Sequence, residues 1–343
     1  MTDRIALVGK TIAELEELMT DLDQPSFRVK QLFNWIYNQK VAQVTEMKNL
    51  PKELRNKLQQ VAKIEEFTVL NRQVSEDGTE KYLFKLADGE KIETVYLPNQ
   101  DGRKSLCISS QVGCAMGCNF CATGLQGLSR NLTAGEIVNQ ILMLERLKEE
   151  RISNVVLMGM GEPLANYAQV LKAIRLINHE AGLNIGSRKI TLSTCGLAPE
   201  IKQLADEELQ LTLAISLHAP TDQLRSQMMP INQRYPLKDL LAACDYYIKQ
   251  TGRRVSFEYA LVEGVNDSQD LARKLATLLS GVLAHVNLIP INPVQEFEYN
   301  KPHRKAIKMF KEQLEMKNIP VTVRVERGAD IDAACGQLKA KED

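Results

Sequence analysis

The sequence predicts an α/β fold in which a complete or partial (β/α) barrel follows an N-terminal accessory region. Three observations lead to this prediction. After residue 103, continuous apolar β-type runs alternate with amphipathic helical stretches, a pattern typical of a parallel sheet covered by helices. Residues 10–63 have helical spacing, and residues 67–108 form short strands interrupted by turns. A doubly wound open sheet is the alternative, but the chain lacks the Gly-x-Gly-x-x-Gly motif that would support it.

The accessory region divides into a helical part and a small β extension. Pro25 separates two helical stretches, and Pro51 opens a third. Their apolar residues recur at helical spacing: Leu15, Leu18, Met19 and Leu22, then Leu32, Phe33, Ile36 and Tyr37. Turn sequences at 76–78, 87–89 and 99–102 divide the β extension into strands. The predicted segments are a helical domain 1–65, a β extension 66–103, the barrel 104–327 and a C-terminal loop 328–343.

Seven apolar runs are the predicted barrel strands. They are residues 105–108, 154–158, 189–193, 211–217, 255–262, 286–289 and 321–325. Helical stretches lie between them, and one of these begins with a capping box formed by Thr133 and Glu136. Six or seven such units in about 230 residues suit a barrel, whose active site lies at the C-terminal ends of the strands.

Composition excludes several classes of protein. The 343 residues are 44% hydrophobic and 25% charged, and 43 Lys and Arg balance 43 Asp and Glu. With no net charge, any nucleic-acid surface must be a local patch. No apolar run is long enough to span a membrane, and the N-terminus does not resemble a signal peptide. Seven cysteines, four of them clustered, argue against a secreted disulfide scaffold. We therefore expect a cytoplasmic protein that uses cysteine for metal or thiol chemistry.

Three cysteines with the spacing Cys114-x3-Cys118-x2-Cys121 follow the first predicted barrel strand, which places them in a loop at the catalytic face. The spacing also suits one face of a helix, but three glycines between residues 113 and 124 favour a loop. A structural zinc site needs four ligands, and Cys107 is the nearest candidate for the fourth. A [4Fe–4S] cluster makes more chemical sense, since three thiolates leave one iron open to a ligand.

This cysteine spacing resembles the signature of radical S-adenosylmethionine (SAM) enzymes, and Gly159–Pro163 resembles their Gly-Gly-Glu-Pro motif. Eight segments in sequence order further resemble the RlmN/Cfr family of radical SAM RNA methyltransferases. They are Cys107–Cys114, Cys121–Gly124, Arg130–Thr133, Met158–Pro163, Ser216–His218, Met229–Asn232, Gly264–Asp267 and Asp332–Gln337. The resemblance runs from about residue 25 to residue 338. Within the family, Pro163 favours the branch that methylates adenosine at C2 over the branch that methylates C8.

The resemblance implies a partial (β/α)6 barrel and a reaction that uses two SAM molecules. Cys335 is implied to take a methyl group from the first SAM, which suits a nucleophilic thiolate. The second SAM, cleaved at a [4Fe–4S] cluster on the three clustered cysteines, is implied to give a 5′-deoxyadenosyl radical that activates this methyl group for addition to adenine. Cys107 is implied to release the product by forming a transient disulfide with Cys335, and Glu93 to be the proton acceptor.

Judged on residue type alone, these positions have simpler interpretations. Cys335 is equally well a buried tail cysteine, Cys107 a strand cysteine and Glu93 a solvent-facing residue on a strand. Two further cysteines, Cys195 and Cys244, are interpreted as packing residues, although Cys195 adjoins a predicted site strand.

The resemblance also implies a set of SAM contacts that follow predicted barrel strands. They are Gly161, Glu162, Ser193, Ser216, Leu217, His218 and Asn292. The glycines of the Gly159–Pro163 segment are expected to admit the ligand, and the carboxylate of Glu162 to accept from the SAM ammonium group. His218 is alternatively a packed core histidine.

The implied substrates are a 23S rRNA adenosine at the peptidyl transferase centre (adenosine 2503) and tRNA adenosine 37. The implied partners are these RNAs and an electron donor such as flavodoxin or ferredoxin, with no membrane, for a monomeric enzyme. Three alternatives remain open at this point: C8 methylation of the same rRNA adenosine, a non-methylating radical SAM enzyme, and a cluster-bearing RNA-binding module.

Two basic stretches are candidate RNA surfaces. Between residues 28 and 63, eight basic and two acidic residues accompany four aromatic residues, Phe27, Phe33, Trp35 and Tyr37. The basic residues are Arg28, Lys30, Lys40, Lys48, Lys52, Arg55, Lys57 and Lys63. Basic side chains bind phosphates and exposed aromatic rings stack on bases, although apolar helix faces and solvated lysines give the same pattern. The second stretch contains Lys301, Arg304, Lys305, Lys308 and Lys311.

Overall fold

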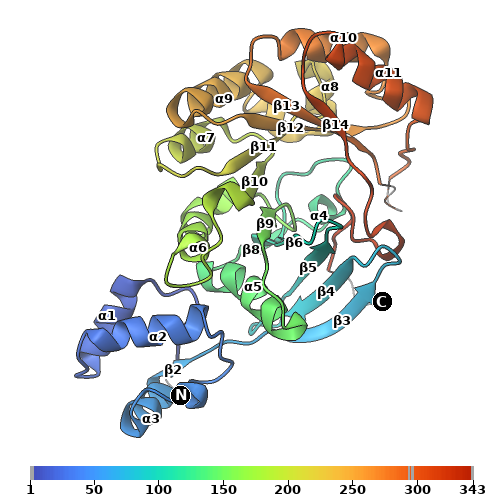
Figure 1. Ribbon diagram of the computed structural model, residues 1–343. Coiled ribbons are helices and arrows are strands. Elements are labelled where there is room, and N and C mark those ends of the chain that lie inside the picture. Colours follow the sequence, from blue (N-terminus) through green and yellow to red (C-terminus); the bar gives the residue numbers. More distant parts are fainter. Residues whose placement is uncertain (1–3, 293, 295–296, 341–343) are drawn as a thin grey trace.

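A ten-stranded sheet organises the computed structural model, which describes residues 4–292, 294 and 297–340 (Figure 1). Its strand order is β14-β13-β12-β11-β10-β9-β6-β5-β4-β3. The strands are β3 (Thr68–Val74), β4 (Glu80–Lys85), β5 (Lys91–Pro98), β6 (Lys104–Cys107), β9 (Asn154–Leu157), β10 (Ile190–Thr194), β11 (Thr212–Ser216), β12 (Val255–Leu261), β13 (Ala284–Pro290) and β14 (Val321–Val323).

Seven of these strands, β6 and β9–β14, pair in parallel with one another and form a partial (β/α) barrel. Each predicted barrel strand is confirmed, because these seven strands occupy the seven apolar runs. Helices connect the strands and lie along the outer side of the curved sheet (Figure 1). They are α5 (Ala134–Lys148), α6 (Tyr167–Asn178), α7 (Ala198–Ala205), α8 (Asp222–Met228), α9 (Leu237–Thr251), α10 (Gln269–Leu278) and α11 (Arg304–Glu315). The predicted capping box is present at the start of α5, where Thr133 and Glu136 cap each other's backbone.

The three strands β3, β4 and β5 continue the same sheet beyond β6 in antiparallel pairing. The segment 66–103 therefore shares its sheet with the barrel. Val95 of β5 pairs with Cys107 of β6, so this extension borders the strand that carries Cys107.

The N-terminal helices form a lobe at one end of the molecule (Figure 1). It contains α1 (Ile12–Asp21), α2 (Phe27–Tyr37) and α3 (Lys52–Val61), with β1 (Ile5–Ala6) and β2 (Ala62–Lys63) paired in parallel. Lys172 of α6 bonds Glu14 of α1 at 2.7 Å, and Lys40 bonds Glu145 of α5 at 2.8 Å. These buried or half-buried ion pairs fix the lobe on the barrel helices. No helix in the described part of the chain has the length and apolar character needed to cross a bilayer.

Candidate active site

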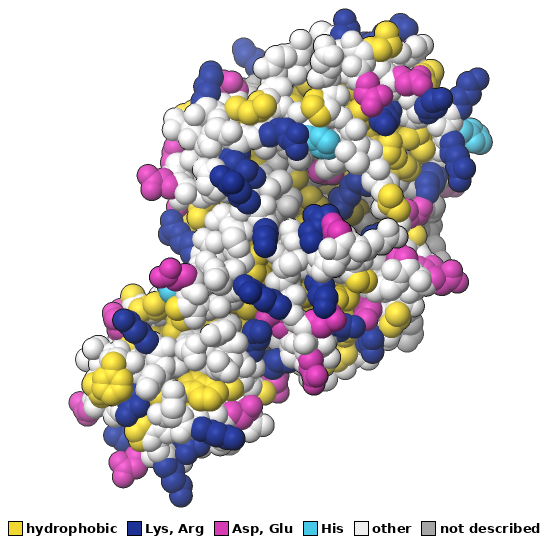
Figure 2. Space-filling model, viewed as in Figure 1, with side chains coloured by type: hydrophobic (Ala, Val, Ile, Leu, Met, Phe, Trp, Pro, Cys, Tyr) yellow, Lys and Arg dark blue, Asp and Glu magenta, His cyan; other side chains and the backbone are white. Residues whose placement is uncertain are grey.

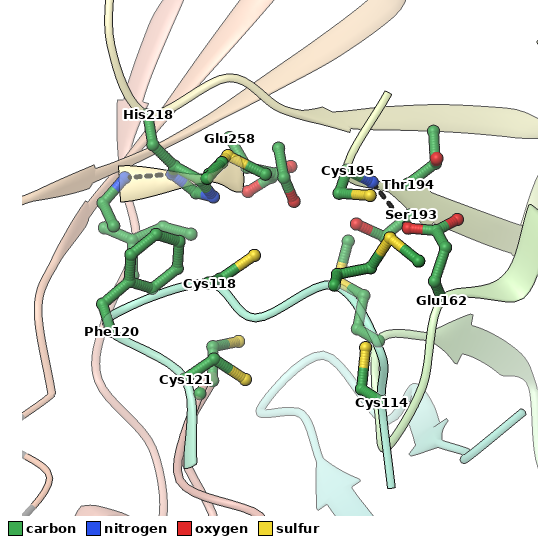
Figure 3. A pocket seen from close by; sticks show the side chains of 18 of the residues that line it. Cys114, Cys118, Phe120, Cys121, Glu162, Ser193, Thr194, Cys195, His218 and Glu258 are labelled. Atoms are coloured by element: carbon green, nitrogen blue, oxygen red, sulfur yellow. Dashed lines mark hydrogen bonds between the residues drawn. The ribbon is translucent and has the colours of Figure 1, made fainter. Parts of the chain in front are cut away.

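A cavity lies where the barrel strands end, as expected for this fold. The loop with the three clustered cysteines lines one side, and residues from the ends of β9–β13 line the other (Figure 3). Cys335, brought back by the C-terminal segment, lines it as well. The structure therefore gathers residues that lie more than 200 positions apart in the sequence.

The cysteine loop runs between β7 (Gln111–Gly113) and the short helix α4 (Ala122–Leu125). Gly113 and Gly117 have φ values of +74° and +63°, a region that favours glycine, so the backbone turns where a helix would continue. The Cys114 amide donates to the Gly127 carbonyl at 2.8 Å and the Cys121 amide to the Cys118 carbonyl at 3.2 Å. The loop prediction is confirmed, and the helical alternative is wrong.

The donor set of this loop fits an iron–sulfur cluster. Burial raises the pKa of the Cys114 thiol to about 11 and that of Cys118 well above its ordinary value, with neighbouring thiols adding to both shifts. Such thiols ionise only when a cationic group compensates them. No three Cys, His, Asp or Glu side chains in the described ranges converge on a single metal position. Cys107, the candidate fourth ligand of a zinc site, does not line the cavity that the three clustered cysteines line.

Glu162 presents a buried carboxylate to the cavity opposite the cysteines (Figure 3). Its Oε1 accepts the Leu164 amide at 2.9 Å, and its Oε2 accepts the Cys195 amide at 2.7 Å. Burial raises the pKa of Glu162, while the two amide hydrogen bonds oppose that shift. The two bonds fix the orientation of the carboxylate and leave further lone pairs for a cationic ligand.

The glycines before Glu162 lie where the protein leaves no space for a side chain. A Cβ atom on Gly159 would lie 2.7 Å from the Ile108 carbonyl, and one on Gly161 would lie 2.5 Å from Cβ of Gln111. Both glycines line the cavity, but the atoms that exclude a side chain there belong to the protein. They are needed for close packing against neighbouring backbone and side-chain atoms, and their role in ligand access stays a prediction.

Four further predicted contacts reach the same cavity: Ser193, Ser216, His218 and Asn292. Ser193 lies at the end of β10, Ser216 ends β11 with His218 just beyond it, and Asn292 follows β13. The Asn292 side chain donates to the Cys335 carbonyl at 3.2 Å, and within the described part of the chain its buried Oδ1 has no hydrogen-bond donor. Leu217 differs, because its side chain is fully buried and is not part of the cavity lining.

His218 is held in one tautomer. Its Nδ1 accepts the Ala260 amide at 2.9 Å, so the ring carries its proton on Nε2. Burial, assisted by the charge of Arg225, lowers the pKa of His218 to about 3, so the ring is neutral at physiological pH. Its φ of +58° is braced by Asn266, whose Nδ2 donates to the His218 carbonyl at 2.8 Å. This brace explains the Gly264–Asp267 motif.

Arg225 is a structural residue of the site that sequence reasoning missed. Its fully buried guanidinium donates to the carbonyls of Cys195 at 2.6 Å, Ser216 at 3.1 Å and Leu217 at 3.1 Å. It also donates to Oδ1 of Asn232 at 2.9 Å, which explains the Met229–Asn232 motif. One side chain thus ties together the ends of β10 and β11. Sequence offered no signal, because an arginine on an amphipathic helix is normally solvated.

The two cysteines of the implied disulfide meet at a second cavity. Cys107 and Cys335 both line it, and Cys335 lines the first cavity as well. Burial, followed by the nearby Cys335, raises the pKa of Cys107 to about 12, whereas Cys335 is exposed. The tail cysteine is therefore not buried as the simpler interpretation supposed. Cys195 lines the first cavity, and Cys244 is a buried packing residue.

Glu93 is 2% exposed, so it is not solvent-facing. Its Oε2 accepts the amides of Lys339 at 2.8 Å and Ala340 at 3.1 Å, and its Oε1 pairs with Lys81 at 3.2 Å. It thereby anchors residues 328–340, named here the C-terminal strap, on which Cys335 lies. In this conformation Glu93 lines neither cavity.

The basic surface of the N-terminal lobe is only partly as expected. Phe33 and Tyr37 belong to the core, so they cannot stack on bases. Phe27 is 53% exposed with Arg28 over its ring at 4.7 Å, and Trp35 is half-buried. Figure 2 shows Lys and Arg side chains spread over the whole visible face, the N-terminal lobe included, with Asp and Glu between them.

Known proteins resemble this chain over almost its whole length. Residues 108–275 match the model of the radical SAM superfamily, and residues 5–64 match that of the ribosomal RNA large subunit methyltransferase N-terminal domain. A probable dual-specificity RNA methyltransferase RlmN of Symbiobacterium thermophilum is 52% identical over 98% of this chain and 91% of its own. The corresponding Clostridium perfringens (strain 13) protein is 51% identical over 96% of this chain and 95% of its own.

A solved structure has the same fold throughout. The radical SAM methyltransferase from Sphaerobacter thermophilus superimposes with a TM-score of 0.94 and 47% identity, covering 98% of this chain and 100% of that one.

Proposed function

Since the chain belongs to the RlmN family of radical SAM RNA methyltransferases, we propose that it methylates C2 of adenosine in 23S rRNA (adenosine 2503) and in tRNA (adenosine 37). The observation that carries the proposal is the position of Cys335. It lines both the cavity with the three clustered cysteines and the cavity with Cys107. A sulfur that is methylated and activated at one place and released at another needs access to both.

The clustered cysteines would bind the iron–sulfur cluster, and residues at the strand ends would bind SAM. Cys114, Cys118 and Cys121 would hold a [4Fe–4S] cluster, which when bound supplies the electron that cleaves SAM to the 5′-deoxyadenosyl radical. Glu162 is oriented to accept from the SAM ammonium group, and the neutral His218 offers its Nε2 proton to a ligand acceptor. The remaining contacts are Gly161, Ser193, Ser216, Asn292 and the backbone of Leu217.

Cys335 and Cys107 act in turn as nucleophiles. The exposed Cys335 thiolate attacks the SAM methyl carbon and leaves S-adenosylhomocysteine, so the sulfur becomes a thioether. After this methyl carbon has bonded to adenine, Cys107 attacks the Cys335 sulfur and breaks its bond to that carbon. The two sulfurs are then joined in a disulfide.

Glu93 is the proposed acceptor of the adenine C2 proton. Its carboxylate is engaged by Lys81 and by two amides of the C-terminal strap, so it reaches the substrate only when the strap moves. Cys335 moves with the strap. The position of the Cys335 sulfur and the accessibility of Glu93 to the substrate are therefore coupled.

RNA recognition is assigned to the N-terminal domain, residues 1–65, which corresponds to the matched methyltransferase N-terminal domain. The exposed Phe27 with its neighbour Arg28 is the best-placed stacking group, and Lys30, Lys48, Lys52 and Lys57 are exposed for phosphate contacts. The β extension 66–103, the barrel 104–327 and the C-terminal loop 328–343 complete the proposed organisation. A flavodoxin or ferredoxin would reduce the cluster of a monomeric, cytoplasmic enzyme.

The test is mass spectrometry of RNA from a bacterial host whose own C2 methyltransferase gene is deleted. The wild-type chain should restore 2-methyladenosine to 23S rRNA and tRNA, and the Cys335→Ala variant should not. The Cys244→Ala variant is the control, because that cysteine lies outside both cavities. Appearance of 8-methyladenosine would overturn the assigned carbon, and restoration by Cys335→Ala would overturn the mechanism.

A further inference from the structure

Arg324 lies directly after β14 and lines both cavities, yet the proposed chemistry gives it no role. Its backbone amide donates to the Leu288 carbonyl at 2.9 Å, which anchors the residue to β13. Its NH1 lies 3.9 Å from Sγ of Cys335, within the range of a weak hydrogen bond to sulfur. The side chain is 36% exposed, so the guanidinium is held at the rim of the two cavities.

The charge of Arg324 is only partly neutralised. NH1 is 3.8 Å from Oε2 of Glu258, longer than a hydrogen bond, and this buried oxygen has no hydrogen-bond donor among the residues that the structure describes. The other oxygen of Glu258 accepts from the Asn287 side chain at 2.8 Å. The guanidinium of Arg324 can therefore attract a second anion. The charge of Cys335 is the largest influence on Arg324 and raises its pKa, ahead of Glu258 and Cys107.

We propose that Arg324 is a positioning residue that holds the Cys335 sulfur at the junction of the two cavities and stabilises it as the thiolate that accepts the methyl group. The proposal rests on the function proposed for Cys335. Cations beside a cysteine favour its thiolate, the form that attacks an electrophilic carbon. Once the sulfur is methylated its negative charge is lost, and so is the attraction to Arg324. The thioether is then free to turn toward either cavity.

Other groups around Cys335 do not replace this cation. Two further charged residues, Glu326 and Arg327, line the second cavity with Cys335, and the NH1 of Arg327 donates to the Pro98 carbonyl at 2.6 Å. Glu258 of β12 is an acid, Cys107 of β6 is a buried thiol, and Asn292 is neutral. On the strap itself, Asp332 is acidic. Across the first cavity lie the clustered cysteines and the carboxylate of Glu162.

The test is the rate at which iodoacetamide alkylates unmethylated Cys335, followed by peptide mass spectrometry from pH 5.5 to 10 on cluster-bearing protein without SAM. The thiolate attacks the CH2 carbon and displaces iodide, so the rate follows the thiolate population. Cys335 is exposed and reachable in the intact fold. The measurement needs neither SAM cleavage nor RNA.

At pH 7.5 the Arg324→Gln variant should react about tenfold more slowly than wild type, equivalent to about one pH unit or 1.4 kcal/mol. The unscreened attraction between Arg324 and a Cys335 thiolate at 3.9 Å would be larger, but the negative charge of Glu258 and the partial solvent exposure of Arg324 reduce it. At pH 10 the two rates should converge. Arg324→Lys should recover part of the rate, since it keeps the charge without the planar fork.

Arg327→Gln is the matched control. It removes the same charge from the same segment and from the lining of the second cavity, but its NH1 donates to the Pro98 carbonyl at 2.6 Å, whereas NH1 of Arg324 lies 3.9 Å from the Cys335 sulfur. Its profile should match wild type. Superimposable wild-type and Arg324→Gln profiles would overturn the proposal, and so would an equal loss of rate at every pH, which indicates altered access. If the pH profile of Arg324→Gln is shifted but Cys335 of the wild-type chain never gains a methyl group in cells, the proposed function is refuted. The influence of Arg324 on the Cys335 thiolate would still hold.

Discussion

Replacing Glu93 with glutamine should release the C-terminal strap. The carboxylate accepts two strap amides, from Lys339 and Ala340, and pairs with Lys81, whose side chain is 11% exposed. Hydrogen bonds to a charged group contribute about 1.5–3 kcal/mol and neutral ones about 1 kcal/mol. Glutamine keeps the shape and loses the charge, so the two strap bonds together should weaken by about 2 kcal/mol.

Hydrogen–deuterium exchange measures this loss directly. A weakening of about 2 kcal/mol corresponds to roughly 30-fold faster exchange of the strap amides when they exchange by local opening. The amide of Ala122 is a second reporter, because it donates to the strap carbonyl of Gly336 at 2.7 Å. Lys81 keeps its hydrogen bond to the Asp332 carbonyl at 3.3 Å, but losing its buried ion pair should also lower the free energy of unfolding, by about 3–5 kcal/mol.

The Glu80→Gln variant separates release of the strap from a general loss of stability. Glu80 is also buried, on the neighbouring strand β4, and it bonds Arg72 at 2.9 Å and Lys148 at 2.6 Å. This variant should lose comparable stability while its strap exchanges at the wild-type rate. Unchanged strap exchange in Glu93→Gln, or equal acceleration in both variants, would refute the idea that Glu93 anchors the strap.

Three further variants test the site. Burial, together with the Arg225 charge, lowers the pKa of His218 to about 3, so the unfolded state binds one more proton than the folded state between about pH 6 and 3. The free energy of unfolding should therefore fall by about 1.4 kcal/mol per pH unit as the pH is lowered through this range. The His218→Asn variant should lose this pH dependence in urea titrations of cluster-free protein. Arg225→Leu should lower the free energy of unfolding by about 3–5 kcal/mol by leaving carbonyls of β10 and β11 without a donor, and a loss under 1 kcal/mol in chemical denaturation would contradict this role. Cys118→Ser should abolish the broad visible absorbance of anaerobically reconstituted protein and its SAM cleavage, whereas Cys244→Ser, outside both cavities, should retain both.

The barrel and the cysteine loop could be predicted because their signals are local. The parallel strands appear in the sequence as apolar runs, and the capping box of α5 lies within four residues. The loop was predictable because its glycines are poor helix formers. Gly113 and Gly117 adopt positive φ values, which glycine tolerates because it has no Cβ atom.

Features that depend on distant parts of the chain could not be predicted. Glu93 alternates on a strand like a solvated residue, and it is buried only because a segment about 240 positions later covers it. Arg225 has the sequence context of a surface helix, but its partners are carbonyls at two strand ends. Gly159 is required by the backbone of Ile108, a crowding that only the fold creates.

The central claim is that Cys335 carries the methyl carbon to RNA and Cys107 releases it. The Cys107→Ala variant, supplied with SAM, reductant and RNA, is the most direct test. It should accumulate RNA bound through the Cys335 sulfur, seen as a protein–RNA species that survives denaturation and is identified by peptide mass spectrometry. The species should be absent from Cys107→Ala/Cys335→Ala and from reactions without SAM or reductant. Normal turnover by Cys107→Ala, or an adduct that persists without Cys335, would contradict the account.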